Sequence, residues 1–329
     1  MSAALSVVII TPDRFATISK TIGHLDVQNL TNQLEIVIVA PSAAGLELDE
    51  SALGRFHSYL VVETGPIFST AMARAAGVRA ASAPIVAFAE DHSYPAPGWA
   101  EALIKRHDEN WAAVGPAVAN ANPHRLTSWA NLLIEYSEWL HPSPSGEREH
   151  LPGHNSSYKR AVLLEYGDRL DEMLDAESVL HWDLRRRGHR LYLEGAACTF
   201  HENFSKPLPC LTLRFNGGRL FAAARSRTWP IWRRAVFALG APLIPFLRFA
   251  RITRVLFLAG RPRHLLSRLW PALLAGLIVD GAGELAGYLL GSGGAMAKLS
   301  DMEFHRERFL AENDEQETNA TEAGTAFAR

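Results

Sequence analysis

The stretch from Ile85 to Trp99 constrains the fold of this chain more than any other. Its first five residues, Ile85 to Ala89, are all apolar, which is typical of a strand buried on both faces of a parallel sheet. Glu90, Asp91 and His92 follow directly, and a turn rich in proline and glycine comes next. Open α/β sheets bind ligands at the carboxyl ends of their strands, so this stretch is a candidate site for a metal ion or for proton transfer.

Alternating strand and helix signals precede this stretch. Runs rich in β-branched residues predict strands, and apolar or alanine-rich periodicity predicts helices: strands at Ser6–Ile10, Leu34–Val39 and Tyr59–Val62, and helices ending near Leu25 and covering Thr70–Ala81. A strand–helix–strand order at this spacing favours a mainly parallel sheet with right-handed crossovers. Similar signals continue to about residue 203, which predicts an α/β domain over residues 1–203.

The composition indicates the cellular compartment but does not indicate a class of partner. The 329-residue chain has the apolar content of a globular protein, 48%, and a formal net charge of only −2. Cys198 and Cys210, its two cysteines, show neither metal-ligand spacing nor a disulfide framework, which favours a reducing compartment. The first residues lack the basic segment and the long apolar core of a signal peptide, so we expect a cytoplasmic protein.

The region after Asn203 has a different charge pattern. Between Phe204 and Val279 there is no aspartate or glutamate, whereas twelve arginines are interleaved with aromatic and aliphatic residues. We assign residues 204–300 to a basic helical segment and residues 301–329 to an acidic, disordered tail. Nucleic acid is a poor partner for the basic segment, because its arginines alternate with aliphatic residues instead of forming a polar surface.

Two apolar stretches in the basic segment, about Ala235 to Ala259 and Leu269 to Gly291, favour contact with a membrane surface. An arginine at the centre of a bilayer costs about 2.5–3.5 kcal/mol, so the three arginines in the first stretch suit a helix lying in the interface near anionic headgroups. Asp280 and Glu284 argue against spanning by the second stretch. The alternative is a helical subdomain that packs on the catalytic domain or on a second copy of the chain.

Several short motifs occur in a fixed order between residues 5 and 203. They are the turn Thr11-Pro12-Asp13-Arg14, the helix sequence Ala73-Arg74-Ala75-Ala76-Gly77, the triplet Glu90-Asp91-His92 with its Pro-x-Pro-Gly-Trp turn, the segment Gly153-His154-Asn155, Glu177 placed eleven residues before Gly188, and His201. In this order the motifs resemble the inverting glycosyltransferases of family 2. The resemblance implies a GT-A fold, which is a nucleotide-binding α/β domain, and sugar transfer from a nucleotide diphosphate to a hydroxyl group.

The same resemblance implies a role for the polar residues in these motifs. It assigns five of them to the nucleotide-sugar donor: Thr11, Pro12, Arg14, Arg74 and Asp91. It assigns three to the acceptor, which could be a glycan in polysaccharide biosynthesis or a lipid-linked sugar: Gly153, His154 and Asn155. Four of these side chains could equally serve as helix caps or surface charges: Arg14, Arg74, His154 and Asn155. Asp91 could ligate the metal instead of hydrogen-bonding the donor ribose.

A divalent cation is expected beside the donor, because the departing diphosphate must be neutralised. We expect Glu90 to be a ligand, with His92 and His201 as the second and third candidates. An imidazole ligand shifts the preference from Mg²⁺ toward Mn²⁺. The alternative for His92 is a loop histidine without a ligand role.

The acceptor hydroxyl needs a general base within hydrogen-bond reach. Glu177 takes this role by its distance from Gly188, although Asp175 and Asp183 lie nearby and could serve instead. His181 lies four residues after Glu177 on the same helix face. These two side chains could therefore form a coupled pair or a two-residue metal site.

Two departures from the family pattern keep other functions open. An aspartate pair that helps to hold the nucleoside is replaced by Ala40 and Pro41, and the Asp-x-Asp motif reads Glu90-x-His92. A catalytically inactive binding or scaffold protein of the same fold is therefore the main alternative. A nucleotidyltransferase is disfavoured, since no glycine-rich phosphate loop follows Ile10. The leading interpretation is a membrane-associated, metal-dependent inverting glycosyltransferase that transfers a hexosyl-type group on the cytoplasmic side of a membrane.

Overall fold

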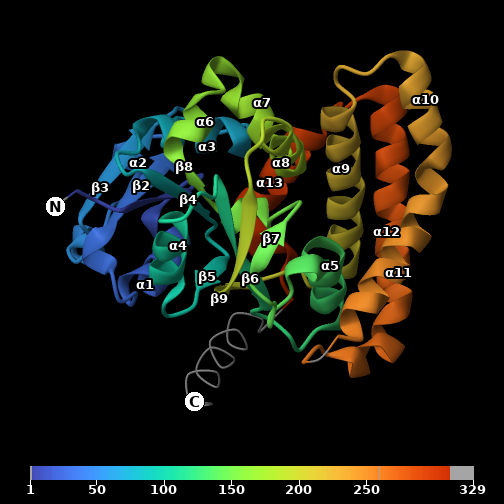
Figure 1. The fold of residues 1–329 in the computed structure, drawn as a ribbon, viewed down its shortest axis with the longest axis horizontal. Coiled ribbons are helices and arrows are strands. Elements are labelled where there is room, and N and C mark those ends of the chain that lie inside the picture. The colour runs from blue at the N-terminus through green and yellow to red at the C-terminus, as the bar shows by residue number, and fades with distance from the viewer. Residues whose placement is uncertain (1, 259, 312–329) are drawn as a thin grey trace. The chain divides into compact units, whose positions relative to one another are not determined.

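The chain divides into two compact units in a computed structural model, which describes residues 2–258 and 260–311 (Figure 1). The first unit contains the residues up to Ala119 together with Ser143–Phe200. The second contains Asn120–Pro142 together with the residues from His201 onward. The chain therefore enters the second unit, returns to the first, and leaves it again.

Within the described residues, nine strands form one sheet in the order β3-β2-β1-β4-β8-β6-β9-β5, with β7 paired to β9. The strands are β1 (Leu5–Ile10), β2 (Leu34–Ala40), β3 (Ser58–Glu63), β4 (Ile85–Ala89), β5 (Ser93–Pro95), β6 (Ala113–Asn120), β7 (Gly146–Arg148), β8 (Ser157–Lys159) and β9 (Leu191–His201). Strands β1 to β4 pair in parallel, whereas β8 is antiparallel to both β4 and β6. The α/β class with a largely parallel sheet is thus confirmed.

Helices connect these strands in the first unit. They are α1 (Phe15–Asp26), α2 (Ala43–Leu46), α3 (Thr70–Ala80), α4 (Trp99–His107), α6 (Arg160–Leu164), α7 (Leu170–Leu174) and α8 (Glu177–Arg186). The predicted early strands and helices agree with this order to within one or two residues. The last strand, β9, is continuous over its eleven residues. Gly195 lies within it, where an added Cβ would meet the Ser143 carbonyl oxygen at 2.1 Å, so this glycine allows close approach and does not end the strand.

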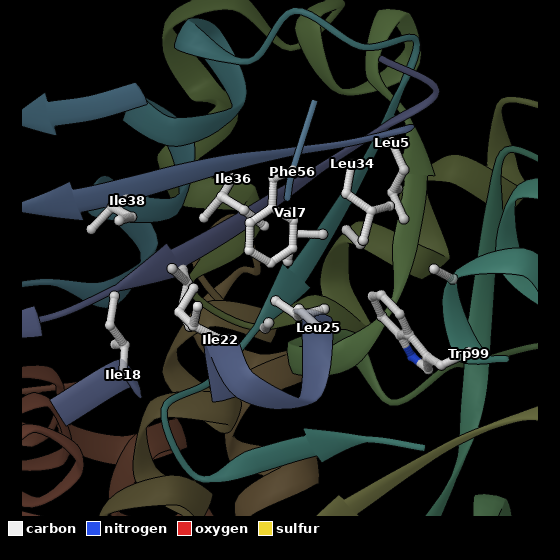
Figure 2. Packing of buried hydrophobic residues seen from close by; sticks show 14 of the residues in the cluster. Leu5, Val7, Ile18, Ile22, Leu25, Leu34, Ile36, Ile38, Phe56 and Trp99 are labelled. Atoms are coloured by element: carbon white, nitrogen blue, oxygen red, sulfur yellow. The ribbon is translucent and has the colours of Figure 1, made fainter. Parts of the chain in front are cut away.

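One face of the parallel strands packs against α1 and α4 (Figure 2). Ile18, Ile22 and Leu25 of α1 recur at helical spacing and are 0–1% exposed, and Trp99 of α4 joins the same cluster. On the other face α3 lies very close to the sheet. An added Cβ on its Gly77 would be 2.4 Å from a Val8 methyl carbon, so glycine is needed for this approach. The packing fixes α3, and with it Arg74 one turn earlier.

The second unit is helical apart from the strand ends that it shares. Its helices are α5 (Leu126–Tyr136), α9 (Pro207–Arg225), α10 (Ile231–Gly240), α11 (Ile244–Leu256), α12 (Leu266–Leu290) and α13 (Ala295–Phe304). Helix α12 packs against α9 on one side and against α10 and α11 on another (Figure 1). Glycines of α12 allow it to approach α9 closely. An added Cβ on Gly283 would lie 2.1 Å from the Phe215 carbonyl oxygen of α9.

Helix α13 continues through Phe304, and a 3₁₀ turn covers Arg306–Phe309, so the first residues of the predicted tail are helical. The rest of the predicted tail, residues 312–329, lies outside the described residues. Two segments, Ile231–Leu256 and Arg263–Leu290, are long and apolar enough to cross a membrane by length and composition alone. The protein buries 22% of the first segment's most apolar window and 50% of the second's.

Candidate active site

The site forms where β1 and β4 end side by side. Ile9 pairs with Ala89, so the turn after β1 and Glu90 after β4 begin at the same edge of the sheet. The hydroxyl of Thr21 on α1 donates to the Glu90 carbonyl oxygen at 2.9 Å and fixes the backbone there. The sheet register therefore brings the ends of the first and third motifs to the same edge of the sheet.

Arg74 of α3 joins two carboxylates that lie far apart in the sequence. Its Nη1 donates to Glu177 Oε1 at 2.9 Å, and its Nη2 donates to Glu90 Oε1 at 3.4 Å. The three side chains are 7%, 12% and 13% exposed in the order Arg74, Glu177, Glu90. Because water screens such nearly buried groups poorly, one guanidinium partly neutralises both acids. Glu177 also begins α8, where the helix dipole favours a negative charge.

The segment Gly153–Asn155 is a 3₁₀ turn that closes the other side of this group. Asn155 Nδ2 donates to Glu90 Oε2 at 3.2 Å, and Arg74 Nη2 donates to His154 Nδ1 at 2.7 Å. A guanidinium can only donate, so His154 Nδ1 is the acceptor and the ring proton lies on Nε2. The His154 side chain is 36% exposed, more than Arg74 and the two carboxylates. It is therefore the member of this group that meets solvent.

Gly153 lies directly against the predicted base. An added Cβ there would be 2.3 Å from both Cβ and Cγ of Glu177. No side chain fits in that space unless Glu177 moves. The glycine of the Gly-x-Asn motif thus sets how closely the turn approaches Glu177.

Glu90 and His92 have the geometry of a pair of metal ligands. His92 Nδ1 donates to Asp91 Oδ1 at 2.6 Å, so the lone pair of the neutral ring lies on Nε2. That atom is 3.6 Å from Glu90 Oε2, a separation that suits two ligands of one ion. Asp91 orients the imidazole in the way that carboxylates beside metal-bound histidines do. The donor set, one carboxylate and one imidazole, fits Mn²⁺ better than Mg²⁺.

His201 ends β9 and belongs to the second unit. Its Nδ1 is 2.9 Å from Asn203 Oδ1, while Asn203 Nδ2 donates to Asn120 Oδ1 at 3.1 Å. Asn203 Oδ1 is therefore an acceptor, His201 donates through Nδ1, and its Nε2 carries the lone pair. This is the tautomer that a metal ligand needs. Its place in the metal site stays a prediction.

His181 is a structural residue. It is fully buried, and burial lowers its pKa to about 3, so the ring stays neutral. Its Nε2 is 2.9 Å from the Tyr158 hydroxyl, and its Nδ1 accepts from the Leu151 backbone N–H at 3.5 Å. Both ring nitrogens are engaged away from Glu177, which disfavours a Glu177–His181 metal site.

The turn Thr11-Pro12-Asp13-Arg14 starts α1. The Thr11 hydroxyl donates to the Arg14 carbonyl oxygen at 3.0 Å, and Asp13 Oδ1 accepts from the Thr17 hydroxyl at 2.7 Å. Arg14 is exposed. The donor-binding roles of this turn and of Asp91 stay predictions.

Sequence reasoning missed several residues that support the site. Thr21 holds the Glu90 backbone, and the Ser93 hydroxyl donates to Glu90 Oε2 at 3.2 Å. Phe88 lies under Arg74, whose Cζ is 5.7 Å from the ring centre. Ser93 follows Glu90 by three residues and could have been found as a local turn contact. No spacing in the sequence points to Thr21, since only the packing of α1 places it there.

Part of the chain is similar to a known protein family. Residues 62–167 match the family model described as "Glycosyl transferase family 2". No curated protein sequence matches the chain. Among solved structures, a mannosyltransferase from Pyrobaculum calidifontis, in complex with GDP-Man and Mn²⁺, is 17% identical with a TM-score of 0.47, and the match covers 87% of this chain and 88% of that one.

A second solved structure, GalNAc-T7 with UDP, GalNAc and Mn²⁺, is 13% identical with a TM-score of 0.45. That match covers 61% of this chain and 44% of the other, so the chain spans less than half of the length of GalNAc-T7. The family match includes Arg74, Glu90, His154 and Asn155, whereas Glu177 and His201 lie beyond it. The segment that carries Arg74, Glu90, His154 and Asn155 is thus similar to glycosyl transferase family 2.

Proposed function

We propose that the protein is an inverting glycosyltransferase that moves a hexosyl-type group from a nucleotide-diphosphate sugar to an acceptor hydroxyl. The observation that carries this proposal is the arrangement around Arg74. One of its two carboxylate partners, Glu90, lies beside His92, and the other, Glu177, lies beside the Gly153–Asn155 turn. Two acids with different neighbours suit two different tasks, metal binding and proton transfer.

We assign metal binding to Glu90 and His92, with His201 as a third ligand. A bound divalent cation, Mn²⁺ in preference to Mg²⁺, would neutralise the charge of the leaving diphosphate. Asp91 keeps His92 in the ligating tautomer. For the donor itself we retain the residues that the family motifs assign: Thr11, Pro12, Arg14, Arg74 and Asp91.

Glu177 is the proposed general base. Arg74 engages its Oε1, so Oε2 is the oxygen that takes the proton from the acceptor hydroxyl. The acceptor oxygen forms a bond to the anomeric carbon as the bond from that carbon to the phosphate oxygen breaks, and the nucleoside diphosphate leaves. Attack from the face opposite the leaving group inverts the anomeric configuration. Gly153, His154 and Asn155 are proposed to position the acceptor.

The acceptor is proposed to be a glycan or a lipid-linked sugar, as in polysaccharide biosynthesis. We further propose that the protein is peripheral to the cytoplasmic face of a membrane and binds it through residues 204–300. The acid-free, arginine-rich stretch of this segment supports that location.

Thermal denaturation with a panel of nucleoside diphosphates, with and without Mn²⁺, tests the donor and metal sites together. A ligand that binds only the folded state raises the melting temperature. We expect a Mn²⁺-dependent rise for one nucleotide, lost in Glu90→Ala and kept in Asp168→Ala, an exposed acid that serves as the control. An equal rise in the Glu90 variant would contradict the metal assignment.

A non-catalytic binding protein is the second candidate, and one observation favours it. β2 ends on Ala40, which is fully buried, and Pro41 follows, so this strand end supplies no carboxylate for a nucleoside. Absence of a shift with every nucleotide would support this candidate. Metal-dependent hydrolysis of a nucleotide sugar, without added acceptor, would exclude it.

A further inference from the structure

Exposed large apolar side chains gather on α10 and α11 and on the residues that directly follow each helix. Nine of them are between 57% and 84% exposed: Ile231, Trp232, Val236, Leu239, Leu243, Phe246, Leu247, Phe257 and Leu258. A run of this kind exceeds the scattered apolar residues of an ordinary protein surface. The set, called here the outer face, needs an explanation.

The outer face is one side of a nearly continuous helical segment. Trp232, Val236, Leu239, Leu243 and Phe246 follow one another every three or four residues, so they share a side. The opposite side packs on α12 and contains buried residues: Ala238, Pro245, Ile252 and Leu256. A segment that is half covered by protein along its length suits an interfacial position better than a single membrane crossing.

Exposed arginines occur on the same two helices as the outer face. Arg233, Arg251 and Arg254 are exposed, and the nearest acidic residues in the sequence lie outside Phe204–Val279. Arg251 is 2.6 Å from Glu138 of the same unit, but both side chains are well exposed, so the pair is weak. An apolar side with cations on the same helices matches the boundary between anionic headgroups and acyl chains.

A second copy of the chain is a poorer occupant. In a two-fold contact the same patch meets itself, so each copy would bring its own Arg233, Arg251 and Arg254 to the shared patch, with few acids to balance them. Like charges at an interface oppose association. Charge complementarity thus favours an anionic membrane surface over a second copy of the chain.

We infer that α10 and α11 lie in the plane of a membrane, with the outer face among the acyl chains and its arginines at anionic phospholipid headgroups. Helix α12 is held against α11, because its Asp280 and Glu284 face Arg248 of α11. This inference rests on the proposed membrane association and is independent of the transfer reaction.

Flotation of the full chain with lipid vesicles tests the inference. We expect binding to vesicles with about one third phosphatidylglycerol, and at least about tenfold weaker binding to pure phosphatidylcholine. Raising the salt concentration from about 0.1 M to about 0.5 M should weaken binding to the anionic vesicles and leave binding to the phosphatidylcholine vesicles nearly unchanged. Equal binding to both compositions would contradict the arginine role.

Single substitutions test which residues contact the vesicle membrane. Leu239→Glu and Phe246→Glu should each weaken vesicle binding at least about tenfold, because a charge replaces an inserted apolar group. Leu208→Glu, at a 74% exposed leucine of α9, is the matched control and should bind as the unmodified protein does. Arg254→Gln should cost about fivefold on anionic vesicles only.

Two outcomes would overturn the inference. One is loss of binding in Leu208→Glu equal to that in Leu239→Glu, which would show that the contact is not specific to the outer face. The other is a dimer in sedimentation that Leu239→Glu dissociates, with no vesicle binding by the unmodified protein. A nucleotide-dependent melting shift measured on the same samples separates either failure from a failure of the transferase proposal.

Discussion

The two units each contain an arginine shared by two acids, and the two groups differ in what surrounds them. In the first unit Arg74 of α3 joins Glu90, which follows β4, and Glu177, which begins α8. In the second unit Arg248 of α11 joins Asp280 and Glu284, which are one turn apart on α12. Each group consists of one arginine and two acids. The first group also has histidine and asparagine neighbours.

The solvent exposure of the two groups distinguishes a candidate site from a structural ion pair. The first group includes His154, which is 36% exposed and can meet a ligand. In the second group the acids are 8% and 6% exposed inside apolar helices, so their task is to hold α11 against α12. We therefore expect changes in the first group to affect activity, and changes in the second to affect stability.

The largest effect is expected for Glu177→Gln. The amide keeps the shape of the side chain but cannot accept the proton, so kcat should fall about 10³-fold. Steady-state transfer assays measure this, and the nucleotide-dependent melting shift should persist. Asp168→Asn is the control. A fall of less than about tenfold would remove Glu177 from the role of base.

Arg248→Met should disrupt the second group and lower stability. Loss of the guanidinium removes the cation that pairs with these two buried acids and should lower the free energy of unfolding by about 3–5 kcal/mol. Urea denaturation measures the loss, and Arg254→Met, at an exposed arginine, should change stability by under about 0.5 kcal/mol. Equal effects of the two substitutions would mean that the Arg248 group is not structural.

Gly153→Ala tests how closely the first group is packed. The new methyl would overlap Glu177, so we expect a loss of about 1–3 kcal/mol in stability and a displaced base with lower kcat. Gly217→Ala is the matched control, because nothing lies within 4 Å of its added Cβ and alanine favours its helix. Full activity in Gly153→Ala would show that Glu177 tolerates displacement.

The smallest effect concerns pH and Glu284. Burial, and next the charge of Asp280, raise its pKa from 4.5 to about 7. The folded state therefore binds more protons than the unfolded state between these values, and this group makes the free energy of unfolding fall as pH rises from about 4.5 to 7. Urea denaturation of Glu284→Gln across this range should lack that fall. An identical pH dependence in both proteins would contradict the assignment.

Much of the fold could be predicted from the sequence because its signals are local. The β-branched strands and the alanine-rich helix before Ile85 appear where their periodicity indicates, and Glu90 follows a buried strand. The link between Arg74 and Glu177 could not be predicted from spacing, since 103 residues separate them and only the packing of Gly77 on the sheet aims α3 at α8. The position of α5 in the second unit was also missed, because its sequence does not reveal which helices cover it.

The discontinuous second unit has a consequence for how the protein is made. Helix α5 packs on α12, with an added Cβ on Gly276 only 2.5 Å from the Ile134 side chain, and Arg214 of α9 is 2.7 Å from Glu135. A ribosome that adds about 5–20 residues per second completes α12 roughly 10–30 s after α5. Until α12 is made, α5 lacks this contact, and the part of its apolar side that α12 covers stays exposed.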